Sequence, residues 1–363
     1  MNLPNNQLIA SIHATLRNYR AHEKNGLLRI SQAHIKYWVN QFDPGDRRAI
    51  LIEMNSVFKK RYCSRKKAKD FLNARILELS EDFGYKNPKL FLKNCQFIDI
   101  QPSGRSQKII LGLLTEVLQS KFNMPFEDCG VKSRKYSIYV DDMLCTGTTL
   151  MRDLRKWSDQ RFSKTKSNLK AVIDGSTELI LCYFFLHRKN YHKKLKDIGY
   201  NISKQMPDKI RAYCGIEVNN ENSIGSKLDL IFPIRSAKRI VQKYQTSVNE
   251  QVENYLDGKA YNKPLENFYR SQRWPAHEGF FTSPIRRNRV ENAFLVKGIE
   301  ILKKSNPQKE NIRALGFALP SERNFGFGTL CFTWRNISNN TPLVFWYSAS
   351  AFRPLFKKKD DYD

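Results

Sequence analysis

The chain has 363 residues, and 62 Lys and Arg against 35 Asp and Glu give it a formal net charge of +27. Hydrophobic residues make up 41%, which is enough for a buried core and excludes a wholly disordered chain. No stretch approaches the roughly 20 apolar residues of a membrane span, and the N-terminus lacks the pattern of a secretory signal. The seven cysteines are scattered and never spaced as CxxC. We therefore expect a cytoplasmic protein with no membrane partner, no disulfide framework and no zinc site.

The N-terminal part is expected to be helical. Apolar residues recur at helical spacing over 35–42, and Asp43-Pro44-Gly45-Asp46 ends that helix. A second helix follows, with its apolar face over 50–58, and Asn87-Pro88 marks a boundary. The predicted regions are a basic helical region over 1–90, an α/β core over 91–235, an α+β extension that packs on this core over 236–356, and a frayed tail over 357–363.

From about residue 94, short apolar runs alternate with helical segments. The predicted helices are 107–120 and 148–161, and the predicted strands are 95–100, 136–140, 179–186, 212–218 and 228–232. Residues 343–347 also read as a strand. This alternation is typical of an open, mostly parallel sheet with helices on both faces.

Three basic clusters indicate a polyanionic partner. The first runs from Lys59 to Lys69 without an acid, the second follows the predicted strand 179–186, and the third is interleaved with aromatic residues over 269–289. Basic groups among flat rings suit single-stranded DNA or RNA, whereas the alternative for each cluster is a solvated face. The expected contact residues are Lys59, Lys60, Arg61, Arg65, Lys66, Lys67, Lys69, Arg188, Lys189, Arg286 and Arg287.

The most informative stretch is 136–150, YSIYVDDMLCTGTTL. A buried strand ends in Asp141 and Asp142, and after a short turn Thr146-Gly147-Thr148-Thr149 opens an amphipathic helix. Ligands of open α/β sheets bind beyond the carboxyl ends of strands. The amides and hydroxyls of a helix start suit a phosphate, which Gly147 lets approach closely. The two acids then face sugar hydroxyls or Mg²⁺, so the segment predicts a ribose 5-phosphate site.

An acidic strand end also occurs in P-loop ATPases. That alternative requires GxxxxGK[ST] upstream, and the chain has no such motif.

The order of residues in this stretch resembles the phosphoribosyl-pyrophosphate motif of type I phosphoribosyltransferases. The shared features are an apolar strand, two acids, two apolar residues, a variable position and Thr-Gly-x-Thr. The resemblance implies a type I phosphoribosyltransferase-like fold, phosphoribosyl pyrophosphate as substrate, and Mg²⁺. It implies catalytic roles for Asp141, Asp142 and Arg105, with the two Asp residues also near the metal, directly or through water.

In that family the loop after the preceding strand grips the pyrophosphate. The corresponding residues here are Ser103-Gly104-Arg105-Ser106, where Gly104 frees the backbone and Arg105 offers a bidentate fork. The alternative is an ordinary capped turn.

Further segments resemble the phosphoribosyltransferase-like domain of bacterial conflict systems, the PRTase-CE-like group. They are His34–Phe42, the Ser103-Gly104 turn and Ser338–Trp346. This resemblance implies an antiphage effector, toxic when activated, that acts on a nucleic-acid or nucleotide acceptor beside a retron reverse transcriptase and its DNA/RNA product. The alternative is a catalytically inactive module that senses nucleotides and binds nucleic acid.

Type I transferases usually carry a mobile loop before the acidic strand, which closes over the reacting sugar. Only residues 119–135 are available here, so we expect either a short lid that carries Lys132, Arg134 and Lys135 or cover from another part of the protein.

Overall fold

The computed structural model describes residues 3–21, 29–221, 227–259, 266–305, 311–349 and 352–356. The expected tail over 357–363 lies outside these ranges. The chain forms two compact units, one of Arg65–Val218 and one of Met1–Ser64 with Asn219–Asp363. No helix in the described ranges has the length and apolar character needed to cross a membrane.

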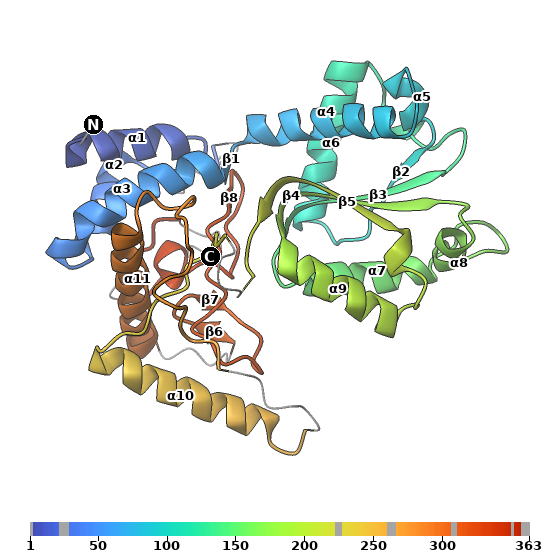
Figure 1. Ribbon diagram of the computed structural model, residues 1–363. Helices are drawn as coiled ribbons and strands as arrows, with labels where there is room; N and C mark the ends of the chain where they lie inside the picture. Colours follow the sequence, from blue (N-terminus) through green and yellow to red (C-terminus); the bar gives the residue numbers. More distant parts are fainter. Residues whose placement is uncertain are drawn as a thin grey trace. The chain divides into compact units, whose positions relative to one another are not determined.

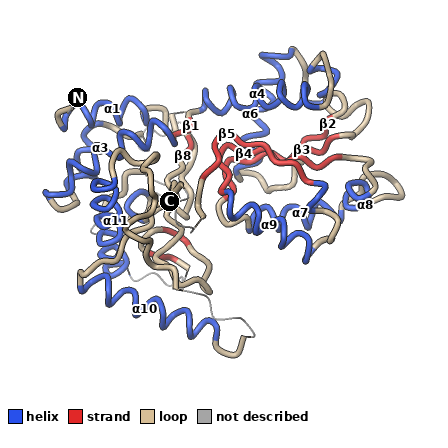
Figure 2. Tube along the Cα trace, viewed as in Figure 1, coloured by secondary structure: helices blue, strands red, loops and turns tan. Residues whose placement is uncertain are grey.

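The unit of residues 65–218 is built on a four-stranded sheet in which every neighbouring pair is parallel, in the order β2-β3-β4-β5 (Figures 1 and 2). Its elements are α4 (Arg65–Asp82), α5 (Pro88–Leu92), β2 (Cys95–Phe97), α6 (Ser106–Phe122), β3 (Tyr136–Leu144), α7 (Thr148–Asp159), α8 (Asn168–Ile173), β4 (Glu178–His187), α9 (Arg188–Asn201) and β5 (Ile210–Val218).

Helices cover both faces of this sheet, as the sequence predicts. One face carries α4 and α6, and the other carries α7, α8 and α9 (Figure 1). The alternation of side chains along β4 explains this arrangement. Leu181 and Tyr183 join the core under α7 to α9, whereas the ring of Phe184 lies 4.9 Å from that of Phe71 on α4.

The second unit is mainly helical and irregular. Its elements are α1 (Asn5–Leu16), α2 (Gln32–Asn40), α3 (Pro44–Arg61), β1 (Tyr62–Cys63), α10 (Arg239–Leu256), α11 (Pro284–Ser305), β6 (Ile312–Arg313), β7 (Gly316–Phe317), β8 (Phe332–Thr333) and the 3-10 helix η4 (Leu343–Phe345). Its core joins segments that are distant in sequence. The indole of Trp38 donates to the carbonyl of Val344 at 2.8 Å and its ring lies 5.6 Å from that of Phe345.

The predicted α/β class and mostly parallel sheet are confirmed, but two predicted strands are wrong. Within 228–232, Leu230 forms only an isolated antiparallel bridge with Thr329. Within 343–347, residues Leu343–Phe345 form the 3-10 helix η4. Both segments are short buried apolar runs, whose periodicity does not separate a strand from a buried turn of helix.

The two units divide the chain differently from the expected ranges 1–90, 91–235 and 236–356. Helix α4, expected in the N-terminal region, packs against α6 and β4 of the sheet unit. The residues after β5 return to the unit that contains the N-terminus.

Candidate functional site

Two turns follow neighbouring parallel strands, so they lie at the same edge of the sheet. Residues 98–105 connect β2 to α6, and residues 145–147 connect β3 to α7. Side-chain contacts join the first turn to the elements on either side of the second, because the Gln101 amide donates to Asp141 Oδ2 on β3 at 3.0 Å and to Asp153 Oδ2 on α7 at 2.8 Å. The structure therefore brings together the two segments that were expected to bind pyrophosphate and ribose 5-phosphate.

The turn after β3 has the backbone that a phosphate site needs. Gly147 has a φ of +73° and caps α7, whose first residues, Thr148 and Thr149, are exposed. Thr146 is half-buried, and its hydroxyl lies 3.2 Å from that of Thr148. The first amides of a helix lack carbonyl partners within it, so the start of the 12-residue helix α7 favours an anion.

The start of α9 holds this turn from the other side. The Asn190 amide donates to the carbonyl of Cys145 at 2.8 Å, and His187 Nδ1 lies 2.7 Å from the carbonyl of Leu144. Cys145 is buried, so its thiol packs in the interior.

The expected placement of the acidic pair at the end of the strand is wrong. β3 continues through Leu144, and Asp141 is paired in register with Tyr183. Because successive side chains of a strand point to opposite faces, Asp141 and Asp142 cannot face one ligand side by side. Asp141 is 4% exposed, whereas Asp142 is half-buried.

Asp141 belongs to a buried polar cluster formed with Gln101, Tyr139 and Asp153. The Gln101 amide donates to Asp141 Oδ2 at 3.0 Å, to Asp153 Oδ2 at 2.8 Å and to the Tyr139 oxygen at 2.9 Å. The Tyr139 hydroxyl lies 3.2 Å and 2.9 Å from the same two carboxylate oxygens. The other oxygen of Asp141 accepts from the backbone N–H of Asp142 at 2.9 Å.

These side-chain contacts outnumber the protons that are present when both acids are ionised. The Gln101 amide supplies two protons and the Tyr139 hydroxyl supplies one. With three protons for five contacts, the donors of Gln101 and Tyr139 are shared between the acceptors of the cluster. Arg152 donates to Asp153 Oδ1 at 2.9 Å and 3.0 Å, so a cation compensates Asp153.

Burial raises the pKa of two groups in this cluster, Asp141 and Tyr139. Burial raises the pKa of Asp141 to about 7, and the charge of Asp142 contributes to the rise. Hydrogen bonds from Ser106, the Asp142 amide and Gln101 oppose it. Burial also raises the pKa of Tyr139 far above its ordinary value, so its hydroxyl keeps its proton.

The turn expected to hold pyrophosphate is exposed. Ser103, Gly104 and Arg105 lie at the surface, and Gly104 has a φ of +80°. Ser106 is the first residue of α6, and its side chain also hydrogen-bonds to Asp141. The side chain of Arg105 makes no capping hydrogen bond to the helix.

The expected short lid is not at this edge. Gly130 and Lys132 donate backbone hydrogen bonds to the carbonyls of Leu92 and Lys93, just before β2. They therefore lie at the amino end of the sheet, which nine-residue β3 separates from the candidate site by about 26 Å. Arg134 lies over the ring of Phe162 at 4.5 Å and does not face the site.

Two of the expected nucleic-acid contacts are structural. Arg287 is fully buried between Glu278 and Glu291, at 2.8 Å and 3.0 Å. Arg61 is 7% exposed and pairs with Asp229 at 3.0 Å. These guanidinium groups compensate buried carboxylates, so the expectation that they contact phosphates is wrong.

Other members of the first cluster make contacts at the surface. Lys60 donates to the carbonyls of residues 279 and 280, at 3.0 Å and 2.8 Å. Arg65 and Lys69 share the carboxylate of Glu116, whose pKa they lower against the opposing effect of burial.

Helix α9 presents a more open basic surface. Its exposed residues recur at helical spacing and include an aromatic ring: Arg188, Lys189, His192, Lys193, Lys196 and Tyr200. Tyr200 is 87% exposed. Arg188 is within 3.4 Å of Glu217. In the other unit, Arg286 remains partly exposed while donating to Glu53 at 3.0 Å. Lys59, Lys66 and Lys67 are exposed as well.

Sequence reasoning missed Gln101, Tyr139 and Asp153. Asp153 left a signal, because it shares the inward face of α7 with Leu150, Leu154 and Trp157, where an acid is out of place. The sequence gives no such signal for Gln101, because its contacts with β3 and α7 form only in the tertiary structure.

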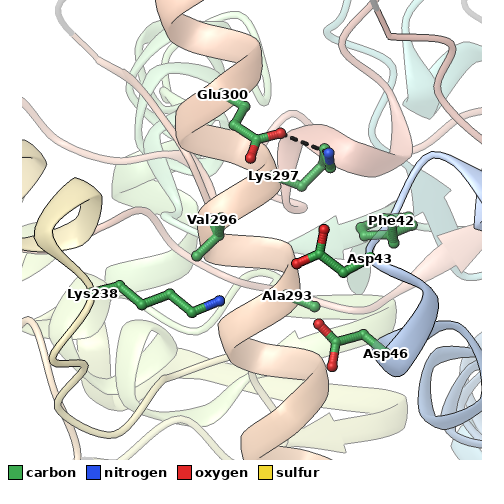
Figure 3. Close-up of a pocket in the computed structure, with 8 residues that line it drawn as sticks. All are labelled: Phe42, Asp43, Asp46, Lys238, Ala293, Val296, Lys297 and Glu300. Carbon is green, nitrogen blue, oxygen red and sulfur yellow. Dashed lines mark hydrogen bonds and ion pairs between the residues drawn. The ribbon is translucent and has the colours of Figure 1, made fainter.

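The described residues contain no group of three or more His, Cys, Asp or Glu side chains placed to hold a metal ion. A pocket in the other unit contains none of the expected site residues (Figure 3). It is lined by Phe42, Asp43, Asp46, Lys238, Ala293, Val296, Lys297 and Glu300. Both signs of charge line it, which does not favour one ligand class.

A comparison with protein families matches residues 35–358 to the family described as PRTase-CE. Searches of curated proteins and of solved structures found no match.

Proposed function

Because this chain belongs to the PRTase-CE family and the turn after β3 has the geometry of a phosphate site, we propose that the sheet unit binds phosphoribosyl pyrophosphate. The turn 146–149 holds the 5-phosphate through the first amides of α7 and the Thr hydroxyls. The turn 103–106 holds the pyrophosphate. The observation that carries the proposal is the pair of contacts from Gln101 to Asp141 and Asp153, because they join the turn after β2 to the strand and the helix that flank the turn after β3.

The two acids have different roles in this proposal. Asp142, half-buried, accepts from the ribose hydroxyls. Asp141 positions the two turns through Gln101 and Tyr139. Mg²⁺ commonly uses one or two carboxylates together with substrate phosphates and water, and Asp142 fits this pattern, holding the ion through water. When bound, the ion neutralises the charge of the leaving pyrophosphate.

The proposed reaction transfers the 5-phosphoribosyl group. The bond from C1 of the ribose to the pyrophosphate oxygen breaks, C1 bonds to a nucleophilic atom of the acceptor, and the acceptor releases a proton. Positioning and electrostatic stabilisation carry this chemistry. In this proposal the exposed guanidinium of Arg105 binds the leaving pyrophosphate, because its paired N–H donors match phosphate oxygens.

The proposed acceptor is a nucleic acid or nucleotide, and α9 supports the nucleic acid. The exposed basic face of α9 includes Tyr200. The same helix holds the turn 145–147 through the contact of Asn190 with Cys145. Lys193→Gln with Lys196→Gln should weaken binding of single-stranded RNA and lower the slope of log affinity against log salt by about 1.4. Lys303→Gln with Lys304→Gln, which removes two exposed lysines that are not among the expected contacts, is the matched control. Equal slopes in all three proteins would remove α9 from the proposal.

We further propose that the chain is a toxic effector of a bacterial antiphage system, beside a retron reverse transcriptase and its DNA/RNA product. This role rests on the family and on the segments His34–Phe42 and Ser338–Trp346. A reverse-transcriptase gene next to the gene for this chain would support it, and an unrelated neighbourhood would count against it.

A catalytically inactive binding module is the second candidate, and the position of residues 123–135 favours it. These residues do not cover the reacting edge, and a site that water reaches favours binding over transfer. Pyrophosphate release from phosphoribosyl pyrophosphate with Mg²⁺, with and without RNA, separates the two. Acceptor-dependent release supports the transferase. Binding of phosphoribosyl pyrophosphate without release supports the module, and absence of binding refutes both.

A further inference from the structure

The side chain of Lys194 on α9 lies across the turn that is proposed to hold the 5-phosphate. A Cβ atom placed on Gly147 would lie 2.3 Å from Cγ, 3.0 Å from Cδ and 3.2 Å from Cε of Lys194. The methylene chain of the lysine thus occupies the space that the missing side chain of Gly147 leaves. This contact explains a glycine at position 147 in addition to its φ of +73°.

The ammonium group stays close to the same turn. Nζ is bonded to Cε, so it lies within about 5 Å of the Cβ position of Gly147. The Lys194 side chain is only 15% exposed, and Nζ is 2.6 Å from Asp197 Oδ2, one turn further along α9. A lysine cation that is mostly withdrawn from water needs such a partner.

The position of Lys194 on its helix separates it from the other lysines of α9. It lies on the same side as Tyr191, Leu195 and Ile198, which pack in the core under α9. Lys193 and Lys196 are exposed. Lys194 is therefore a mostly buried cation whose side chain lies across the turn at the start of α7.

We infer that Lys194 binds the phosphate in the turn, and that Asp197 holds the ammonium group until the phosphate arrives. This inference rests on the proposed function. A phosphate dianion at the amides of α7 attracts the ammonium more strongly than one carboxylate does, and the flexible lysine stem permits the exchange. The site then contains a positive charge before the phosphate binds. Asp197 lowers the free-energy cost of burying that charge while the site is empty.

The competing explanation is that Lys194 only fills space over Gly147. Lys194→Met distinguishes the two, because methionine keeps an unbranched apolar chain and loses the charge. Asp197→Asn is the complementary change, since it releases the ammonium group and leaves Lys194 in place. Lys204→Met removes an exposed charge just after the same helix and is the matched control.

The experiment titrates ribose 5-phosphate into each protein by calorimetry at constant salt, with ribose as the ligand that lacks phosphate. We expect Lys194→Met to lose about tenfold in affinity for ribose 5-phosphate, Asp197→Asn to gain about threefold, and Lys204→Met to stay within about twofold of wild type. The affinity for ribose should be the same in all of them.

Wild-type affinity in both Lys194→Met and Asp197→Asn would overturn the inference and leave the proposed function standing. If Lys194→Met does not fold, Asp197→Asn decides, and an unchanged or lower affinity there overturns the inference. No binding of ribose 5-phosphate or phosphoribosyl pyrophosphate by the wild-type protein would overturn the proposed function itself.

Discussion

The buried proton on Asp141 should make the stability of the sheet unit depend on pH near neutrality. The pKa of Asp141 is raised from 3.8 to about 7, chiefly by burial. The folded state therefore binds a proton that the unfolded state has already released between these values. The stabilisation is fully present below pH 3.8 and is lost as the pH rises through 7.

The size of the effect follows from this single proton. Its release lowers the stability by roughly 1 kcal/mol per pH unit at most, so the stability should fall by about 2–3 kcal/mol between pH 5 and pH 8. Asp141→Asn cannot ionise, so its stability lacks this slope. At pH 5 the variant should be about 1–3 kcal/mol less stable than wild type, because its amide cannot reproduce every contact with Gln101, Tyr139 and the Asp142 amide. At pH 8 the wild type should have lost this advantage, so the variant should be about as stable as wild type or more stable.

Hydrogen exchange of the β3 amides, measured from pH 5 to 8 and corrected for intrinsic rates, reports the stability of the unit that holds Asp141. Asp142→Asn is the control, because Asp142 is half-buried. The stability of this variant should still fall with pH, but the fall should occur at slightly lower pH. The reason is that the charge of Asp142 is one cause of the raised pKa of Asp141. Parallel curves for wild type and Asp141→Asn would show that no proton is taken up at Asp141 on folding.

Two further predictions concern Gly147 and Arg287. Gly147→Ala should destabilise the sheet unit by more than the roughly 1–2 kcal/mol of a left-handed non-glycine residue, because its Cβ displaces Lys194. Adding Lys194→Ala should restore only the steric part, and equal melting temperatures of the single and double variants would contradict this. Arg287→Met removes the cation that pairs with Glu278 and leaves Glu291 with Arg270 alone, and it should cost about 3–5 kcal/mol, whereas Arg289→Met, whose side chain is 55% exposed, should cost less than about 1 kcal/mol. Equal thermal unfolding of these two variants would refute the structural role of Arg287.

The sheet unit was predictable because its signals are local. Alternating strands and amphipathic helices over 94–218 specify the order of the elements, and the parallel order follows from the helical crossovers. The turn 146–149 was predictable for the same reason, because a glycine between a strand and a helix defines its backbone. The length of β3 was not, since Asp141 and Asp142 read as a strand end, although the strand continues to Leu144.

The irregular unit was harder to predict because its core joins distant segments. Trp38 and Val344 are separated by 306 positions, and nothing in either segment indicates the other.

The basic clusters show the same limit of local signals. Lys189 lies at the surface of α9, whereas Arg287 is fully buried between two carboxylates. Both belong to basic runs of the sequence, and the acids that compensate Arg287 and Arg61 become their partners only through the tertiary structure. A basic run in the sequence therefore does not show whether a given cation neutralises a buried carboxylate or is exposed and able to bind a phosphate.

Asp141 and Asp142 have different surroundings because neighbouring side chains of β3 point to opposite faces of the sheet. Adjacent acids that alternate across β3 meet different surroundings, so one becomes a buried hydrogen-bonding group and the other stays near the surface. Gln101 connects the turn after β2 to Asp141 on β3 and Asp153 on α7, the two elements that flank the turn after β3, and protonation of Asp141 adds a donor to this cluster. Loss of the proton at higher pH should therefore loosen both turns together, so that the affinity for ribose 5-phosphate falls along with the stability of β3.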